Sequence, residues 1–475
     1  MPNLTEMDMD STRLEKDMLG ELPVPRTALY GIHTVRAVAN LGISGRRVDP
    51  LLIHAYGAVK LAAARTNHAL GSWDDTTFAA IEDACCEMMS GTLDQHIVVD
   101  ALQGGAGTST HMNVNEVLAN RALQLLGALP GDYGRISPLD DINLHQSTND
   151  TYPTALKVAA IGGVRGLEKE IILLMESFQR KEKEFADVVK IGRTQMQDAV
   201  LTTMGRSMSA FAEALGRDRW RIYKCEERLR VVALGGTAIG TGLAAPRHYI
   251  FKVTEQLKVI TGYGLARADN LVECTQNADV FAEVSGILNA CAVNLYKIAN
   301  DIRFMASGPD AGIGELILPA LQAGSSIMPG KVNPVVLESA IQAAIATMAD
   351  HTAITHACAA GNLELNPFLP LVADRLLSSI RVLSNACRIM AERCVSTMEV
   401  NREVCRRHVA GSTATLTALL DQIGYDTALS LLKEMKTCAK PLRELVIEKG
   451  LLSGEQYDER VSAEAATRLG SRESL

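Results

Sequence analysis

Apolar side chains recur every three or four positions over long stretches of this chain, which is the spacing of an α-helix. The first such pattern consists of Leu167, Ile171, Leu174, Phe178, Phe185 and Val189. The second consists of Val280, Val284, Ile287, Cys291, Leu295, Ile298 and Ile302. The helix that the second pattern predicts is apolar around much of its circumference, so we expect it to lie inside a bundle.

The distribution of proline also favours long helices, because proline interrupts an α-helix. Residues 154–308 contain a single proline, Pro246, and residues 371–440 contain none. Gaps of this length are typical of long helical segments. A third long helix is predicted over residues 334–356, with a proline in its first turn.

Strand signals are sparse, since aromatic residues make up only 4% of the chain and alternating runs are short. A small hairpin is expected between Leu22 and Ile32 or within Gln197–Thr203. The sequence therefore predicts a mainly α protein built on a bundle of long helices. We divide it into an N-terminal region of residues 1–150, a central bundle of residues 151–396 and a small helical region of residues 397–475.

The bulk composition excludes several classes of protein. The 475 residues are 47% hydrophobic and 21% charged, which is ordinary for a globular protein, and no apolar run reaches membrane-spanning length. The net charge of −8 argues against nucleic acid as a partner, because no basic stripe offsets it. The acidic first 17 residues lack the basic-then-apolar order of a signal peptide, so a cytoplasmic protein is expected.

Neither cysteine nor histidine shows a metal-binding pattern. The ten cysteines are scattered through apolar segments without a CxxC pair, so we expect reduced and mostly buried thiols. His351 and His356 are predicted on one helix but are five positions apart, and such residues do not stack on one face. No structural metal is expected.

Four polar clusters lie where long helices are predicted to begin or end. They are GGAGTST at 104–110, HQSTND at 145–150, GRTQMQD at 192–198 and GSSIMPGKVNP at 324–334. The first lacks the GxGxxG and GK[ST] spacings of nucleotide loops. Taken alone, the second is typical of a helix N-cap and the third of a helix C-terminus at which the chain turns back.

The fourth cluster is the most informative, because it places two hydroxyls, a lysine and an asparagine amide on a glycine-hinged segment. Such a segment can close over a small anion and present both a base and a positive charge to it. The alternative is a surface turn rich in serine and glycine. Together the clusters supply neutral donors and one cation, Lys331, without an obvious histidine or cysteine nucleophile. This inventory suits a small dicarboxylate.

From end to end the chain resembles the aspartase/fumarase superfamily, and within it the aspartases. The matching segments, in family order, are RLEKDMLG (13–20), YGIHTVRA (30–37), QGGAGTST (103–110), NVNEVLANRAL (113–123), QSTNDTYPT (146–154), GRTQMQDAV (192–200), GGTAIGTGL (235–243) and GSSIMPGKVNPV (324–335). Fumarases usually carry SSND in place of STND and a histidine where Gln195 stands. The resemblance implies a homotetramer with a twenty-helix core and active sites that are each shared by three subunits.

The resemblance also implies a role for individual residues. Ser325 would be the general base, an alkoxide that removes a proton from the carbon beside the β-carboxylate. The resulting aci-carboxylate would be cradled by Thr108, Ser147, Thr148 and Ser326. The α-carboxylate would be held by Thr194, Lys331 and Asn333, and the leaving amine would face Asn149 and Gln195. An unperturbed serine is not acidic enough for this chemistry, so we expect backbone N–H groups to stabilise the alkoxide. Glu315 is expected to order the lid and its lysine.

The implied activity is the reversible deamination of L-aspartate to fumarate and ammonia. No cofactor is expected to be required, and the sequence does not decide whether Mg²⁺ activates the enzyme. A fumarate hydratase or a lyase of a substituted aspartate would use the same mechanism with another leaving group. A non-catalytic structural protein on the same scaffold is the alternative from a different class, and the intact polar clusters argue against it. The departures from the family pattern lie outside the assigned residues, at Arg206-Ser207, Asp310 and Pro367–Leu369.

Overall fold

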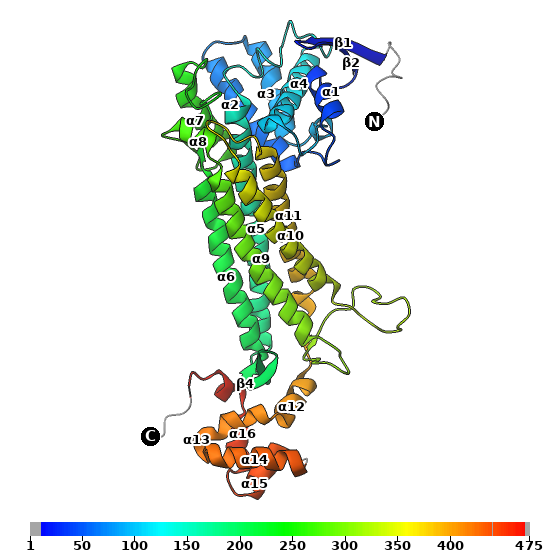
Figure 1. The fold of residues 1–475 in the computed structure, drawn as a ribbon, viewed down its shortest axis with the longest axis vertical. Helices are drawn as coiled ribbons and strands as arrows, with labels where there is room; N and C mark the ends of the chain where they lie inside the picture. Colours follow the sequence, from blue (N-terminus) through cyan, green and yellow to red (C-terminus); the bar gives the residue numbers. More distant parts are fainter. Residues whose placement is uncertain (1–10, 439, 471–475) are drawn as a thin grey trace. The chain divides into compact units, whose positions relative to one another are not determined.

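A computed structural model describes residues 11–438 and 440–470. The first ten residues, on which the expectation about a signal peptide partly depends, lie outside the described residues. Most of the described chain is helical, so the predicted mainly α fold class is confirmed (Figure 1). No helix of the described chain is both long enough and apolar enough to cross a membrane.

The chain divides into two compact units, each assembled from separate stretches of sequence. Unit 1 comprises Met1–Glu168, Trp220–Ala290 and Ala346–Leu383, and unit 2 comprises Lys169–Arg219, Cys291–Ile345 and Ser384–Leu475. The five longest described helices contribute residues to both units: α5 (Thr148–Glu184), α6 (Met204–Leu229), α9 (Asp279–Met305), α10 (Val335–Ala359) and α11 (Leu369–Arg393). The predicted division into three regions stays a prediction.

The periodic patterns predicted these helices well. Helix α9 contains the whole second pattern, and α10 begins at Val335, directly after a proline, as expected. The first pattern is helical only as far as Phe178, because α5 ends at Glu184. The helical prediction for Phe185 and Val189 was therefore wrong. Phe185 lies in the turn that follows this helix and Val189 begins a strand, so the apolar spacing continues past the helix only because both positions pack inward or lie in a partly buried strand.

The described part of unit 1 holds six further α-helices. They are α1 (Ile32–Asn40), α2 (Pro50–Ala69), α3 (Asp75–Met89), α4 (Thr108–Leu125), α7 (Arg247–Thr261) and the short α8 (Leu271–Gln276). Helix α2 packs against both α3 and α7, and α3 packs against α4. The side chain of Asp49 caps α2 by accepting the N–H of Leu51, and the proline at the first helical position needs no N–H partner. Most residues of the alanine-rich α2 are buried, and the helices of this unit that pack against it cover it.

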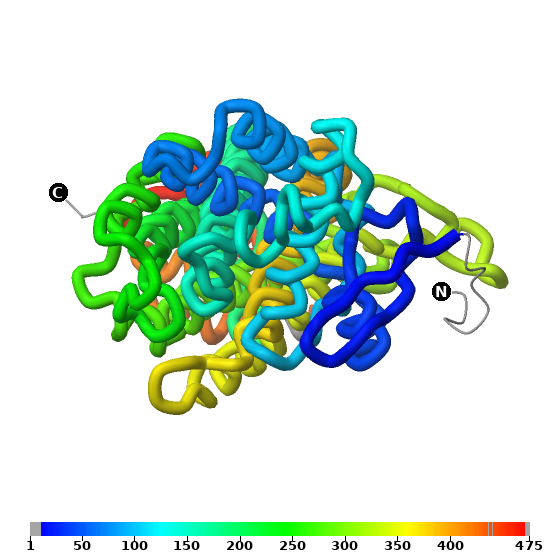
Figure 2. The backbone as a smooth tube through the Cα atoms, turned by 90° about the horizontal axis from the view of Figure 1, so that it is seen from above, coloured from blue at the N-terminus to red at the C-terminus, as the bar shows by residue number. Residues whose placement is uncertain are grey.

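Two antiparallel hairpins account for most of the strand content that the structure describes. The first joins β1 (Thr12–Asp17) to β2 (Gly20–Pro25), and Figure 2 shows it in dark blue beside α1. It lies earlier than the predicted Leu22–Ile32, because Gly20, with φ of 115°, permits a tight turn directly after β1. The second joins β3 (Val189–Thr194) to β4 (Gln197–Thr203). The hairpin predicted within Gln197–Thr203 was therefore wrong in its bounds, because that stretch forms only the second strand and the first strand precedes it.

Four short strands form the two remaining strand pairs of the described chain. Strand β5 (Val231–Val232) pairs in parallel with β6 (Ala266–Arg267), and β7 (Leu316–Ile317) pairs antiparallel with β8 (Glu399–Val400). The second of these pairs matters for the site, because it anchors the segment between α9 and α10 at one end. From Leu318 to Pro334 that segment has no helix or strand.

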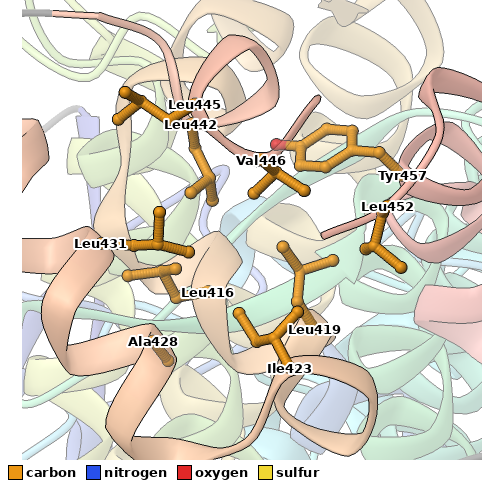
Figure 3. Close-up of a cluster of buried hydrophobic side chains, with 10 residues drawn as sticks. All are labelled: Leu416, Leu419, Ile423, Ala428, Leu431, Leu442, Leu445, Val446, Leu452 and Tyr457. Carbon is orange, nitrogen blue, oxygen red and sulfur yellow. The ribbon is translucent and has the colours of Figure 1, made fainter. Parts of the chain in front are cut away.

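The C-terminal part of unit 2 has a small hydrophobic core of its own (Figure 3). The helices around it are α12 (Arg402–Gly411), α13 (Leu420–Ile423), α14 (Tyr425–Cys438), α15 (Leu442–Glu448), α16 (Gly454–Arg460) and α17 (Ala463–Thr467). Leu419, Leu442 and Val446 are fully buried at its centre. All ten cysteines of the chain are free thiols and most are buried, as the sequence predicted.

Candidate active site

The predicted site residues fall into two sets, one in each unit. The set in unit 1 comprises Thr108, Ser147, Thr148 and Asn149. The set in unit 2 comprises Thr194, Gln195, Glu315, Ser325, Ser326, Lys331 and Asn333. Each set is described by itself below.

Ser325 lies in the segment that links β7 to α10, which extends away from α9 and α10 (yellow-green in Figure 1). Its hydroxyl oxygen accepts the backbone N–H groups of Ile327 at 3.2 Å and Met328 at 2.9 Å. The partial positive charges of two N–H groups therefore point at this oxygen. Such an arrangement favours negative charge on the oxygen and lowers the free energy needed to deprotonate it.

The loop of residues 324–334 is closed at its base by Gly324. The N–H of Gly324 donates to the carbonyl of Lys331 at 2.9 Å, and its carbonyl accepts Nδ2 of Asn333 at 2.7 Å. A Cβ atom at Gly324 would lie 2.4 Å from the Lys331 carbonyl oxygen. Only glycine therefore permits this closure. Asn333, predicted to bind the α-carboxylate, uses one of its two amide hydrogens to hold the loop.

Lys331 is exposed at the end of this loop. Together with Asn333, Lys190 and Arg193 it lines an open cavity of about 1280 Å³ in unit 2. A cationic side chain at the rim of such a cavity can attract a small anion. Ser326, next to Ser325, is also exposed, so its hydroxyl is accessible to a ligand.

Thr194 and Gln195 lie at the tip of the β3–β4 hairpin and are both exposed. The prediction that cluster 192–198 marks the end of a long helix was wrong, because α5 ends ten residues earlier than Thr194, at Glu184. Gln195 and Met196 form the two-residue turn, with φ of 53° and 63°. Turns of this kind need positive φ at both positions and usually contain asparagine or glycine. Gln195 is thus held in a costly conformation, which is common at functional sites.

Glu315 is fully buried and lies against a lysine, an arginine and a histidine. It pairs with Lys190 at 3.1 Å, with Arg193 at 2.8 Å and with Nδ1 of His408 at 3.2 Å. Glu315 therefore ties β3, which carries Lys190 and Arg193, to α12. In the described chain no contact joins Glu315 to Lys331, so nothing supports the part of the prediction that concerns the lysine of the lid.

In unit 1, Thr108 begins α4 after a tight turn over Gly105–Gly107. Gly107 has φ of 97°, and a Cβ atom there would lie 2.1 Å from the ring of Tyr152. This close approach of backbone to an aromatic ring explains the need for glycine. The Thr108 hydroxyl donates to the Gly105 carbonyl at 2.7 Å and is exposed at the start of the helix.

The polar cluster at 147–149 lies at the start of α5, with Ser147 directly before its first residue, so it is also the N-cap cluster that its composition suggested. The Ser147 hydroxyl accepts the N–H of Asn149 at 3.2 Å. Buried Asp150 accepts the N–H groups of Ser147, Gly235 and Thr237 at 3.0 to 3.1 Å. Burial raises the pKa of Asp150 to about 6, and the three N–H donors oppose that rise. Asp150 thereby ties the 235–243 segment to the start of α5.

The side chain of Asn149 has a defined orientation. Its Nδ2 donates to the carbonyl of Ala238 at 2.7 Å, so the amide nitrogen belongs on this side. The amide oxygen is then left as an acceptor. An acceptor at this position suits a ligand group that donates hydrogen bonds, such as an ammonium.

Sequence reasoning missed a buried pair behind Thr148. Nζ of Lys60 lies 2.7 Å from Nε2 of His111, and Nδ1 of His111 lies 2.9 Å from the Thr148 hydroxyl. Burial lowers the pKa of Lys60 to about 7, and burial together with Lys60 lowers the pKa of His111 well below its usual value. The available signal was a single lysine within the apolar run AVKLAAA at 58–64.

Comparisons with known proteins first identify the class of protein. A family model described as lyase matches residues 20–348, and one described as fumarase C C-terminus matches residues 416–468. Among the residues that the structure describes, no group of three or more His, Cys, Asp or Glu side chains could hold a metal ion. The two family models, in this order along the chain, give it the organisation of a fumarase-type lyase.

Similar proteins narrow this class to a family. An aspartate ammonia-lyase of Bacillus sp. is 42% identical over 96% of this chain and 98% of its own length, and one of Pseudomonas aeruginosa is 44% identical over 93% and 94%. A solved fumarate lyase:delta crystallin from Brucella melitensis has a TM-score of 0.92 at 43% identity, covering 96% of this chain and all of its own. A class II fumarase from Schistosoma mansoni has a TM-score of 0.86 at 34% identity, covering 96% and 99%. The chain belongs to the aspartase/fumarase superfamily, as its motifs predicted.

Proposed function

We propose that this protein is a carbon–nitrogen lyase that converts L-aspartate reversibly to fumarate and ammonia. The observation that carries the proposal is the 42% identity, over 98% of its length, to a protein named aspartate ammonia-lyase. The identity to a class II fumarase is lower, at 34%. An amine is therefore favoured over a hydroxyl as the leaving group.

In the proposed reaction Ser325 acts as an alkoxide and removes a proton from the carbon beside the β-carboxylate. The two N–H groups that its oxygen accepts, from Ile327 and Met328, support this role because they stabilise the charged form. They come from the same loop, so the serine and its stabilising donors move together. Proton abstraction places a second negative charge on the β-carboxylate, which becomes an aci-carboxylate.

The extra charge on this group requires donors that are already in position. We assign that role to the hydroxyls of Thr108, Ser147, Thr148 and Ser326. The loss of one donor to a developing oxyanion costs about 3 kcal/mol in the activation barrier. The α-carboxylate is assigned to Thr194, Lys331 and Asn333, among which Lys331 supplies the cation.

The leaving amine is assigned to Asn149 and Gln195. The contact of Asn149 with Ala238 supports this assignment, because it leaves the amide oxygen as an acceptor for an ammonium group. A leaving hydroxyl would need a proton donor instead. Gln195 is held at the hairpin tip, where its side chain is free to reach a ligand.

We further propose a homotetramer whose active sites are shared by three subunits. The separation of the predicted site residues into two sets supports shared sites, since a second copy could complete either set. Exposed apolar side chains on α9, including Val293 at 51% and Phe304 at 40%, support a helix face that packs against another copy. Sedimentation at several protein concentrations tests the assembly, and a stable monomer would contradict it.

The proposed chemistry uses only acid–base and electrostatic steps, so we propose that no cofactor is required. The effect of Mg²⁺ is a separate matter. Turnover measured after exhaustive chelation, and again after Mg²⁺ is added, separates a requirement from an activation. A complete loss of turnover that Mg²⁺ restores would contradict the cofactor proposal.

The deciding experiment is a turnover assay on the purified protein with a panel of dicarboxylates. The double bond of fumarate absorbs in the ultraviolet, so absorbance should rise on addition of L-aspartate. An increase with L-malate and none with L-aspartate would identify a fumarate hydratase instead. An increase only with substituted aspartates would keep the mechanism and change the substrate. No turnover with any member of the panel would favour the non-catalytic alternative.

A further inference from the structure

A buried chain of hydrogen bonds runs from Lys60 through His111 to Thr148, and the steps above use only its last member, Thr148. It crosses three helices, α2, α4 and α5. Lys60 is 2% exposed and His111 is 1% exposed, so water does not compete for these hydrogen bonds. One end of the chain is a titratable amine and the other is a hydroxyl of the predicted site.

Gln146 determines the direction of the hydrogen bonds at Lys60. Its Nε2 donates to the carbonyls of Ile142 at 3.0 Å and Leu144 at 3.1 Å, so its Oε1 must be the atom that faces Lys60, at 2.8 Å. The Ile142 carbonyl lies 3.5 Å from the Lys60 Nζ as well. Both oxygens can only accept, so each takes a hydrogen from the amine.

When Lys60 is an ammonium, its third hydrogen points at Nε2 of His111. Neutral histidine carries one ring hydrogen, which must then lie on Nδ1 and be donated to the Thr148 oxygen. The hydroxyl hydrogen of Thr148 is therefore free for a ligand. In this state Thr148 is a donor to a carboxylate.

When Lys60 is a neutral amine, it has only two hydrogens. Every group keeps a partner when these go to the Gln146 oxygen at 2.8 Å and to the more distant Ile142 carbonyl at 3.5 Å, since neither oxygen can donate and Nε2 of His111 can. Its lone pair then accepts a hydrogen from Nε2 of His111, and Nδ1 becomes an acceptor. The Thr148 hydroxyl donates to Nδ1, and the Thr148 oxygen offers only lone pairs to a ligand. A carboxylate at this position is then repelled. A single proton on Lys60 thus reverses the polarity of a hydroxyl two hydrogen bonds away.

We propose that His111, directed by Lys60, is a positioning residue that keeps the Thr148 hydroxyl as a donor to the substrate carboxylate. Substrate affinity accordingly falls when Lys60 loses its proton. This inference depends on the proposed function in one respect, which is that Thr148 contacts the substrate. The geometry of the buried chain is independent of that function.

The surroundings of Lys60 allow the switch to operate near neutral pH. Cys85 on α3 faces Lys60, and burial raises the pKa of its thiol, so it carries no charge there. Asp150 on α5 also acts on Lys60, and its ionised form favours the ammonium. Burial outweighs this attraction and lowers the pKa of Lys60 to about 7.

Two further titratable groups lie nearby. The ring of Tyr56 stacks on the ring of His111, with 5.8 Å between the ring centroids. Burial raises the pKa of the Tyr56 phenol well above the usual value, so this phenol stays neutral. Asp141 lines a small cavity beside Lys60, and its carboxylate accepts the indole N–H of Trp73 at 2.8 Å and the backbone N–H of Ser137 at 2.7 Å. The thiol of Cys85 and the phenol of Tyr56 thus stay neutral, whereas Lys60, with a pKa of about 7, and Asp150, with a pKa of about 6, both change charge near neutral pH.

The first test measures the affinity of succinate for the full-length protein between pH 6 and 8.5 by titration calorimetry. Succinate has two carboxylates and no amine, so the titration of an amino group does not contribute. Above pH of about 7 the affinity of the wild-type protein should fall by up to about tenfold per pH unit. Lys60→Met and His111→Phe should abolish this pH dependence, and His111→Phe should weaken binding by roughly tenfold or more at pH 6.

A matched control comes from a second histidine–hydroxyl pair in unit 1. Nδ1 of His351 lies 3.0 Å from the Ser285 hydroxyl, and neither residue contacts a predicted site residue. His351→Phe should therefore bind succinate with the wild-type pH profile. Loss of the profile in this variant as well would assign the effect to general disturbance of the fold and overturn the inference.

A second test needs no variant and no activity. Neutron diffraction from deuterium-exchanged crystals at pH 6 and pH 8.5 locates the ring deuterium of His111. It should lie on Nδ1 at pH 6 and on Nε2 at pH 8.5. A deuterium that stays on one nitrogen overturns the inference, whether or not the protein deaminates aspartate. A deuterium that moves without any change in succinate affinity overturns it too, since Thr148 would then not contact the diacid. Absence of aspartate turnover, with both effects present, would count against the proposed reaction alone.

Discussion

The hydroxyl oxygen of Ser325 lies 2.9 Å from the backbone nitrogen of Met328 and accepts its N–H. The N–H of Ile327 reaches the same oxygen at 3.2 Å. Both donors lie within three residues of the serine, so the loop polarises the hydroxyl that it carries, whatever else approaches. This local arrangement is what separates Ser325 from an ordinary surface serine.

Replacement of this hydroxyl should separate chemistry from binding. In Ser325→Ala the general base is absent, so turnover of L-aspartate should fall by about 10² to 10⁴-fold. The affinity for succinate should stay within about twofold of the wild-type value, because the carboxylate donors remain. Turnover is followed by fumarate absorbance and affinity by calorimetry.

Ser326→Ala is the matched control for this change. It removes a neighbouring hydroxyl that stabilises charge but removes no proton, so its loss of turnover should be smaller. Turnover in Ser325→Ala that equals the wild-type rate would exclude this serine as the base.

Closure of the loop should depend on the absence of a side chain at Gly324. A Cβ atom there would lie 2.4 Å from the Lys331 carbonyl oxygen and 2.8 Å from the Asn333 nitrogen. Gly324→Ala should therefore displace the loop and reduce turnover by up to about a hundredfold. Its melting temperature should be unchanged, since the loop is exposed and no core residue moves.

The control for this substitution is Gly411→Ala at the end of α12, where nothing lies within 4 Å of an added Cβ. This variant should retain wild-type turnover and stability. Equal turnover in the two variants would contradict the prediction that closure of the loop at Gly324 places the general base Ser325.

The charge of Glu315 should matter for stability. Glu315→Gln leaves Lys190, whose side chain is 6% exposed, without its anionic partner. Removal of one member of a buried ion pair typically costs 3 kcal/mol or more, so we expect a loss of about 3 kcal/mol. Thermal unfolding at one fixed protein concentration measures the change.

Glu403→Gln on α12 provides the comparison. Glu403 pairs with Arg406 at 2.6 Å, but both side chains are 73% exposed, so solvent screens the pair. This substitution should change stability by no more than about 0.5 kcal/mol. Equal losses for the two glutamates would contradict the view that Glu315 balances a buried charge.

Lys60 should make the stability of the protein depend on pH. Its folded-state pKa of about 7 lies below the ordinary value of 10.5, so between these values the unfolded chain binds more protons than the folded chain. The free energy of unfolding should therefore rise with pH across this window, by up to about 1.4 kcal/mol per pH unit. Lys60→Met should lose this contribution.

The measurement is the difference in melting temperature between Lys60→Met and the wild-type protein at pH 7 and at pH 9. The methionine variant should gain most relative to the wild type at pH 7 and less at pH 9. A difference that is the same at both pH values would place Lys60 in a site where its charge is not penalised.

The long helices and the serine loop follow from the sequence alone. The three-to-four spacing from Val280 to Ile302 depends only on neighbouring residues, and the helix it predicts is α9. The motif at 324–334 likewise carries its own glycine, hydroxyls and cation. Properties that depend on residues close in sequence are readable because the backbone between them has few conformations.

The tertiary structure decided which distant side chains meet. Glycine and polar residues occur both at the C-terminus of a helix and in the turn of a hairpin. The sequence of residues 192–198 fits either structure, and only the fold showed that it is the tip of a hairpin. Lys60 and His111 are 51 positions apart, and Glu315 and His408 are 93 apart. Such pairs arise when packed helices bring separate segments together, and the burial that shifts the pKa of Lys60 exists only after that packing. No local pattern of residues records it.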